Sequence, residues 1–221
     1  GDTFDACYAA AHDYAAENDA KMVPPFDHAD VIEGQATVGL EILEELTDGP
    51  VDVMIVPVGG GGLSAGLVQV FAEQSPSTEF IFVEPEGAPS LKESLKAGER
   101  INLQMINNFV DGAAVGKIGA LNFSHLKDQS ADSVILANED SLCETIIEML
   151  NVEGTVLEPA GALSIEALRH IPQDEIKGKT FVCVNSGGNF DFERLPEVKE
   201  RALKSAGLKK FFILRLPQRP G

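Results

Sequence analysis

The stretch V-P-V-G-G-G-G-L-S-A-G, residues 56–66, decides the fold class, because it joins a buried strand to a helix. The apolar, β-branched run V-D-V-M-I-V-P-V at 51–58 predicts a strand buried in a parallel sheet. Residues Leu63–Glu73 predict the helix that follows the glycines. Such a junction presents backbone N–H groups at a helix N-terminus, which is a general anion-binding arrangement.

This junction matches three active-site patterns. The dinucleotide fingerprint G-x-G-x-x-G/A fits Gly60, Gly62 and Ala65, and Glu84 ends the next strand at the spacing expected of a ribose-binding carboxylate. The hydrolase elbow G-x-S-x-G is centred on Ser64. The glycine run also suits a single phosphate, because its N–H groups and the positive end of the helix dipole can meet at one anion.

A single phosphate is the favoured ligand among these three. Four consecutive glycines exceed what the dinucleotide fingerprint requires, and they suit a backbone wrapped round a small group, where any Cβ would obstruct the approach. Ser64 is expected within the helix rather than on a strained turn, and nothing marks His125 or His170 as its base. No lysine follows the glycines as in loops that bind nucleoside triphosphates with magnesium.

A second glycine motif, V-N-S-G-G-N-F at 184–190, follows another predicted strand. Ser186 is expected at the carboxyl end of that strand, where α/β sheets bind ligands. Taken alone, S-G-G-N is also an ordinary turn sequence. Together with E-P-A-G-A at 158–162 and F-V-D-G-A-A-V at 109–115, it favours a binding site.

The rest of the chain predicts alternating strands and helices. Strands are expected at 79–84, 133–137 and 180–184, and helices at 3–17, 29–46, 88–97, 139–150, 159–169 and 197–204. Thr3 is expected to cap the first of these helices. The pattern predicts an α/β fold, a parallel or mixed twisted sheet flanked by helices. Residues 211–216 predict a last strand, either at the sheet edge or at the start of another domain.

Charge and composition exclude several classes of function. The chain carries 35 acidic and 17 basic residues, a net charge of -18, which argues against nucleic acid and against an anionic membrane surface as partners. Its apolar runs are too short to span a bilayer, and its first residues do not resemble a signal peptide. Three scattered cysteines suggest neither a disulfide framework nor a zinc site, and they fit a reducing cytoplasm.

The motifs in their order along the chain resemble the pyridoxal-phosphate enzymes of the tryptophan-synthase-β-like fold (fold type II), and within them the threonine dehydratases, or threonine ammonia-lyases. The segments that carry the resemblance are G-D-T-F-D-A, P-P-F-D-H-A-D-V-I-E-G-Q-A-T, V-P-V-G-G-G-G-L-S-A-G, V-E-P-E-G-A, N-N-F-V-D-G-A-A-V, E-P-A-G-A-L and S-G-G-N. They span nearly the whole chain. The chain would then be the large-domain portion of that fold.

The resemblance implies the cofactor, the reaction and the site residues. Pyridoxal 5'-phosphate is the implied cofactor, and conversion of L-threonine to 2-oxobutanoate and ammonia is the implied reaction, with L-serine a poorer substrate and a homo-oligomer as the assembly. The implied cofactor-binding residues are Gly59, Gly60, Gly61, Gly62 and Leu63 at the phosphate, Ser186 at the pyridine nitrogen, and Gly112 and Glu158 in the wall. A neutral hydroxyl at that nitrogen makes the ring a weaker electron sink, which favours loss of the β-hydroxyl.

One part of the family pattern has no counterpart here. The Schiff-base lysine of the family lies in a segment like S-F-K-x-R-G, which does not occur in these 221 residues. The resemblance therefore predicts an internal fragment without a catalytic lysine: the end of a small domain at 1–28, the large cofactor-binding domain at 29–206, and the start of an ACT-like regulatory domain at 207–221. We expect such a fragment alone to be inactive.

Two alternatives remain open on the sequence. Serine racemase or serine dehydratase of the same family is one, although Ser90 stands where the racemases place a second acidic metal ligand, so no metal is expected. An NAD-binding oxidoreductase, interpreted from G-x-G-x-x-A, is the other.

Overall fold

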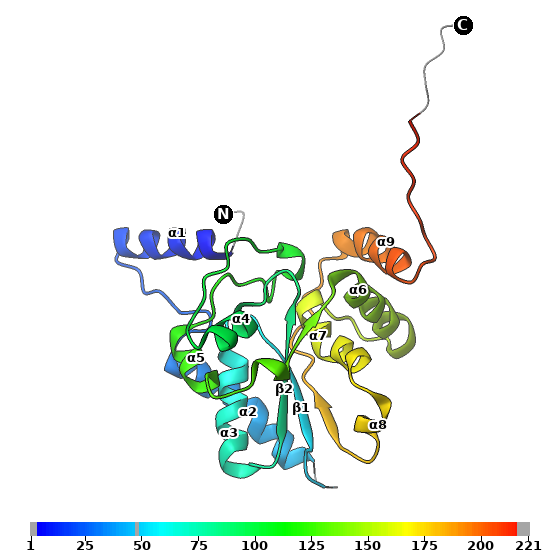
Figure 1. Cartoon of the computed structure of the whole chain (residues 1–221). Coiled ribbons are helices and arrows are strands. Elements are labelled where there is room, and N and C mark those ends of the chain that lie inside the picture. Colours follow the sequence, from blue (N-terminus) through cyan, green and yellow to red (C-terminus); the bar gives the residue numbers. More distant parts are fainter. Residues whose placement is uncertain (1–3, 47–48, 216–221) are drawn as a thin grey trace, which may run out of the picture.

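Within residues 4–46 and 49–215, which the computed structural model describes, four parallel strands form one sheet (Figure 1). The strands are β1 (Val53–Pro57), β2 (Glu79–Pro85), β3 (Val134–Ala137) and β4 (Phe181–Cys183), in the order β3-β2-β1-β4. Val53 of β1 pairs with Glu79 on one side and with Phe181 on the other. The winding direction of the chain therefore reverses between β1 and β4, and such a reversal is where α/β sheets bind ligands.

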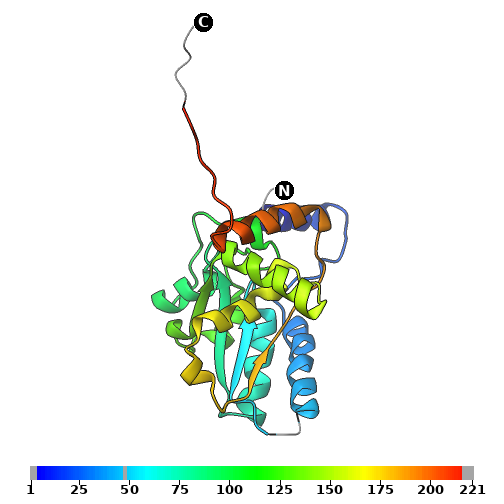
Figure 2. The same ribbon diagram turned by 90° about the vertical axis from the view of Figure 1, so that its right-hand side faces the viewer.

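Helices cover both faces of the sheet (Figures 1 and 2). The described α-helices are α1 (Phe4–Glu17), α2 (Ala29–Glu45), α3 (Gly62–Gln74), α4 (Ser90–Ala97), α5 (Ala120–Leu126), α6 (Glu139–Glu148), α7 (Pro159–Ala167), α8 (Gln173–Ile176) and α9 (Leu195–Ser205). A π-helical turn, Met149–Glu153, continues α6, and short 3₁₀ turns lie at Asn108–Val110, Ala131–Ser133, Leu168–His170 and Phe192–Arg194.

The apolar residues of β1 alternate between two cores, as the two-residue period of a strand requires. Val53 and Ile55 pack in a cluster with residues of α6, α7 and α9. Met54 and Val56 face the other way, toward α2 and α3. The strand is buried throughout because both of its faces are covered.

The structure confirms the predicted α/β class and most of the predicted elements. The strand predicted at 51–58 covers Val53–Pro57, and the helix predicted from Leu63 begins one residue earlier, at Gly62. The predicted cap at Thr3 lies outside the described residues. Two short helices, α5 and α8, have no counterpart in the sequence prediction.

The alternative of an edge strand at 211–216 is wrong over residues 211–215, which have no strand pairing. The start of another domain stays a prediction, and Leu216 lies outside the described residues. In Figure 1 this segment points away from the sheet and its helices. The side chains of Phe211, Phe212, Ile213 and Leu214 are between 68% and 100% exposed. Strand propensity alone does not form a strand when no neighbouring strand is available for hydrogen bonding.

None of the helices in the described part of the chain is long and apolar enough to cross a membrane.

Candidate functional site

A cavity of about 350 Å³ lies at the carboxyl ends of β1 and β4, at the reversal in winding. Its lining residues come from five places in the sequence: Pro25, Phe26, Val31 and Gln35; Pro57 and Gly59–Ser64; Asp111, Gly112, Ala113 and Val115; Ala160; and Ser186. Among these described residues Asp111 is the only one with a formal charge. The volume is within the range of small-molecule and cofactor sites.

The glycine loop, residues Gly59–Gly62, lines this cavity, and helix α3 begins at its last residue, Gly62. The first N–H groups of a helix have no acceptor within the helix, so those of Gly62 and Leu63 are available to a ligand. Gly61 has a φ of +90°, a left-handed backbone conformation that residues other than glycine adopt only with strain. The loop therefore combines free donors, a helix dipole and a backbone turn that requires glycine.

Gly60 is required for a reason that the sequence did not reveal. A Cβ built on Gly60 would lie 2.2 Å from Cγ of Phe26, because the Phe26 ring lies directly against the loop. A Cβ on Gly59 would lie 3.0 Å from the Cα of Ala113 on another side. These two glycines thus allow the walls of the cavity to pack on the loop, whereas sequence reasoning attributed them to the approach of a phosphate.

The opposite wall is formed by Gly112, with Glu158 behind it. A Cβ on Gly112 would lie 2.8 Å from the Cβ of Ala160 and 3.3 Å from Oε1 of Glu158. Burial raises the pKa of the Glu158 carboxyl above its ordinary value, and the negative charge of Asp111 raises it further; a hydrogen bond from the backbone N–H of Asn189 has the opposite effect. Glu158 is not among the residues that line the cavity, and it stays a predicted site residue that contacts the wall through Gly112.

Ser186 reaches the cavity from the S-G-G-N turn after β4. The turn is tied to the start of α7, since Glu158 N donates to Gly187 O at 3.2 Å. The segment before the turn is also tied to α7, because Ser164 Oγ donates to Val184 O at 2.9 Å. The seven predicted residues Gly59, Gly60, Gly61, Gly62, Leu63, Gly112 and Ser186 thus line one cavity.

Two arginines hold the segment that leads into Gly112. Arg194 Nη2 donates to Phe109 O at 2.7 Å, and Arg194 Nη1 lies 3.6 Å from Asp111 Oδ1. The guanidinium groups of Arg194 and Arg201 lie over the Phe109 ring, 4.8 Å and 4.1 Å from its centroid. The ion pair also offsets the negative charge of Asp111 beside a candidate anion site.

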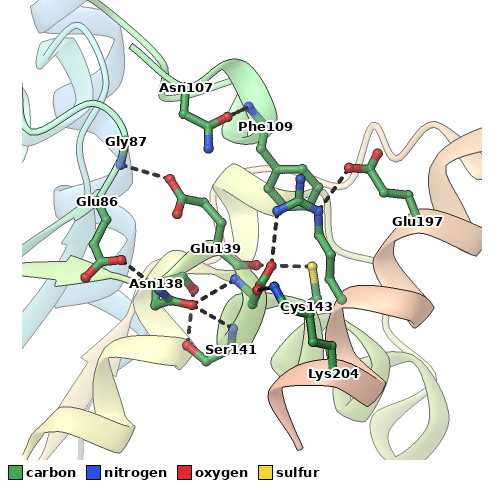
Figure 3. A network of polar contacts seen from close by, with 12 residues as sticks. Glu86, Gly87, Asn107, Phe109, Asn138, Glu139, Ser141, Cys143, Glu197 and Lys204 are labelled. Atoms are coloured by element: carbon green, nitrogen blue, oxygen red, sulfur yellow. Dashed lines mark hydrogen bonds and ion pairs between the residues drawn. The ribbon is translucent and has the colours of Figure 1, made fainter. Parts of the chain in front are cut away.

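Figure 3 shows the polar network near Phe109, where α9 meets the N-terminus of α6. Asn138 caps α6 by accepting from Asp140 N at 3.0 Å, and its Nδ2 donates to Glu86 Oε2 at 2.7 Å. The Asp140 carboxylate pairs with Lys204 at 2.7 Å and with Arg201 at 3.1 Å. The hydrogen bond from Lys204 is the main reason that the pKa of Asp140 lies below its usual value.

The hydrolase and dinucleotide interpretations have little support in this geometry. Ser64 lies within α3 and its Oγ is 3.4 Å from Pro57 O; neither His125 nor His170 lines the cavity that Ser64 lines. Glu84 is fully buried, and its carboxylate accepts hydrogen bonds from the backbone of α4 instead of facing a ribose.

The Ser90 hydroxyl donates to Glu84 Oε1 at 3.3 Å. Within the described ranges, no group of three or more His, Cys, Asp or Glu side chains is arranged to hold a metal ion.

Sequence reasoning missed several residues that build the site. Pro25, Phe26 and Asp111 belong to quoted motifs, but no chemical signal marked them as cavity residues. Asn122 and Arg194 lie outside every motif, and only their contacts in the fold connect them with the site.

A parallel α/β sheet with a glycine-rich loop and a cavity at its winding reversal is typical of cofactor-binding proteins. The protein-family model described as "Pyridoxal-phosphate dependent enzyme" matches residues 1–187, and the chain belongs to this family.

Relatives with known names agree with this assignment. The chain is 43% identical over 221 residues to the biosynthetic L-threonine dehydratase IlvA of Halalkalibacterium halodurans, covering 100% of this chain and 52% of the relative. It is 43% identical over 223 residues to the protein of the same name from Lactococcus lactis, covering 53% of it. The chain therefore spans about half the length of the curated relatives it matches.

Solved structures confirm the predicted fold class, fold type II. The processed form of threonine deaminase isoform 2 from Solanum lycopersicum superposes with a TM-score of 0.79 at 36% identity, covering 86% of this chain and 55% of that chain. The serine racemase of Dictyostelium discoideum superposes with a TM-score of 0.71 at 30% identity, covering 86% and 60%.

Proposed function

We propose that these 221 residues form the phosphate side and the pyridine side of a pyridoxal 5'-phosphate site. The observation that carries the proposal is the shared cavity of the glycine loop and Ser186, in a chain of the pyridoxal-phosphate-dependent family. The N–H groups of Gly59–Leu63 would bind the phosphate, and the Ser186 hydroxyl would meet the pyridine nitrogen. Gly112 would form part of the wall beside the ring, where the lack of a Cβ lets it pack against Ala160 and Glu158.

When bound, the cofactor supplies an electron-accepting ring for bond breaking next to an amino group. The residues of this chain determine how strongly the ring accepts electrons. A neutral Ser186 hydroxyl does not hold a proton on the pyridine nitrogen as a carboxylate would. Such a site favours prompt loss of a β-hydroxyl over reactions that need a long-lived carbanion.

We further propose that the whole protein is an L-threonine dehydratase that also accepts L-serine. Support comes from the 43% identity to biosynthetic L-threonine dehydratases along the full chain. Serine racemase is the weaker alternative, because the buried Glu84 carboxylate accepts hydrogen bonds from Ser90 Oγ and from the backbone at the start of α4. No lysine lines the cavity among the described residues, so we expect no turnover by these 221 residues alone.

We also propose a domain arrangement, an oligomeric assembly and a cellular location for the protein. Residues 1–28 would end a small domain, residues 29–206 would form the large domain, and residues 207–221 would begin an ACT-like domain. The exposed apolar side chains at 211–214 support contact with further protein and a homo-oligomer. Three free cysteines and the acidic surface support a cytoplasmic setting without nucleic-acid or membrane partners.

The test is a titration of the purified chain with pyridoxal 5'-phosphate, followed by absorbance and fluorescence, for the wild type and Gly61→Ala. Alanine at a φ of +90° costs about 1–2 kcal/mol in backbone strain. Relaxing that strain would turn the loop N–H groups away from the phosphate. We expect saturable binding by the wild type and an affinity at least about tenfold lower for Gly61→Ala.

Gly98→Ala is the matched control. Gly98 also has a positive φ, +71°, at the C-terminus of α4, where no atom lies within 4 Å of its built Cβ. The control has the same kind of backbone strain and should keep the wild-type affinity. Equal cofactor affinity in wild type and Gly61→Ala would refute the assignment of the loop.

A further inference from the structure

Asn122 of α5 connects the glycine loop to the segment that covers it. Its side chain is fully buried, and its Nδ2 donates to Gly60 O at 2.7 Å and to Phe26 O at 3.1 Å. The same short helix is held by Asp27, whose carboxylate accepts from Ala120 N at 2.7 Å and from Leu121 N at 2.8 Å. Asn122 thus bridges two walls of the cavity without lining it.

The carbonyl group of Gly60 has both of its acceptor positions filled on the α5 side. One donor is Asn122 Nδ2, and the other is Gly119 N at 3.1 Å. Neither Gly119 nor Asn122 lines the cavity. In a planar trans peptide the C=O of one residue and the N–H of the next point in opposite directions. Fixing the Gly60 carbonyl toward α5 therefore turns the Gly61 N–H away from α5, which is the side of the cavity.

The Asn122 side chain makes these bonds at a cost. Its Oδ1 is buried and has no hydrogen-bond partner among the described residues. The orientation of the amide is unambiguous, because both partners of Nδ2 are backbone carbonyls, which only accept. An apolar side chain of similar size would avoid the buried acceptor. The amide adds two donors, one to Gly60 O in the glycine loop and one to Phe26 O.

We infer that Asn122 is a positioning residue of the phosphate site: by holding the Gly60 carbonyl, it aims the Gly61 N–H at the bound phosphate and fastens Phe26 over the loop. The inference rests on the proposed function, because it assumes an anion at Gly59–Leu63. It gives α5 a role in binding that its sequence does not suggest.

The experiment is an NMR titration of the ¹⁵N-labelled 221-residue chain with inorganic phosphate, and then with pyridoxal 5'-phosphate, following the amide signals of Gly59–Leu63. Asn122→Leu keeps the size of the side chain, removes both donors and adds no charge. We expect the phosphate affinity of Asn122→Leu to fall at least about tenfold and the response of the Gly61 amide to be lost.

Ser94→Ala is the control for general loss of stability. Ser94 is equally buried, and its Oγ makes two hydrogen bonds, to Ser90 O at 2.6 Å and from Ile101 N at 2.9 Å. Its variant should keep the wild-type phosphate affinity. If Asn122→Leu does not fold, Asn122→Val, which is smaller and also lacks a donor, carries the same expectation.

The outcomes separate the two ideas. A folded Asn122 variant with wild-type affinity and an unchanged Gly61 response would overturn the positioning role and leave the proposed function intact. A wild-type chain whose amides at 59–63 respond to neither ligand would overturn the proposed function, and the inference with it.

Discussion

Replacing Gly161 by alanine should destabilise the protein by about 1–3 kcal/mol and remove most of its affinity for pyridoxal 5'-phosphate. A Cβ on Gly161 would lie 2.0 Å from Gly187 O and 2.9 Å from both the carbonyl carbon and the nitrogen of Gly187. All three atoms belong to the backbone, so no side chain can rotate to relieve the overlap. Either α7 or the S-G-G-N turn must move.

Moving α7 is the costlier of these two responses. Its residues Ala160, Ala162, Leu163 and Ala167 are buried at the centre of the larger core. The turn is the more exposed element and should therefore yield, carrying Ser186 away from the cavity. Stability and cofactor affinity are thus expected to fall together in this variant.

Urea unfolding and a cofactor titration of Gly161→Ala measure the two effects. Gly34→Ala is the matched control, since Gly34 lies in α2 and no atom comes within 4 Å of its built Cβ. That control should gain about 0.5–1 kcal/mol, because alanine is the better helix former. A Gly161→Ala chain with the wild-type unfolding midpoint and wild-type affinity would disprove the close packing of α7 on the turn.

The sequence predicts those parts of the site that depend on local chemistry. The β-branched run before Val58 and the glycines after it suffice to place a strand, a tight turn and a helix N-terminus. The S-G-G-N turn follows a strand in the same way, so Ser186 could be placed at the same edge of the sheet. In both cases neighbouring residues in the sequence determine the geometry.

Contacts between distant segments account for what the sequence did not predict. Helix α5 is only seven residues long, and Asp27, 93 positions before Ala120, supplies the acceptor for its first N–H groups. The same segment presents the Phe26 ring to Gly60. Residues 211–215 do not form the edge strand that their sequence favours, because a β-prone sequence without a neighbouring strand stays unpaired.

Glu84 should make the protein less stable as the pH rises from about 4.5 to about 7. Its carboxyl is fully buried at the end of β2, and burial raises its pKa from 4.5 to about 7, despite hydrogen bonds from Leu91 N, Lys92 N and Ser90 Oγ. A carboxyl with a raised pKa holds its proton more tightly in the folded state than in the unfolded state. The stabilisation is therefore complete below the unfolded pKa and is lost as the pH passes through the folded value.

The size of this loss is on the order of 3 kcal/mol between pH 4.5 and pH 8. Glu84→Gln cannot ionise, so its stability should lack this contribution, in addition to a constant loss because its amide has a single accepting oxygen for the donors on both carboxylate oxygens. Urea unfolding of both chains at several pH values measures the difference. We expect the stability of Glu84→Gln relative to wild type to improve as the pH rises.

Ser90→Ala tests the cause of the effect. The Ser90 hydroxyl stabilises the charged form of Glu84, so its removal should raise the Glu84 pKa and move the pH-dependent loss to higher pH. Parallel pH profiles for wild type and Glu84→Gln would contradict the raised pKa. The expected profiles would instead establish Glu84 as a buried acid that joins β2 to the start of α4. Its role would then be structural, whereas the dinucleotide fingerprint would have Glu84 bind a ribose.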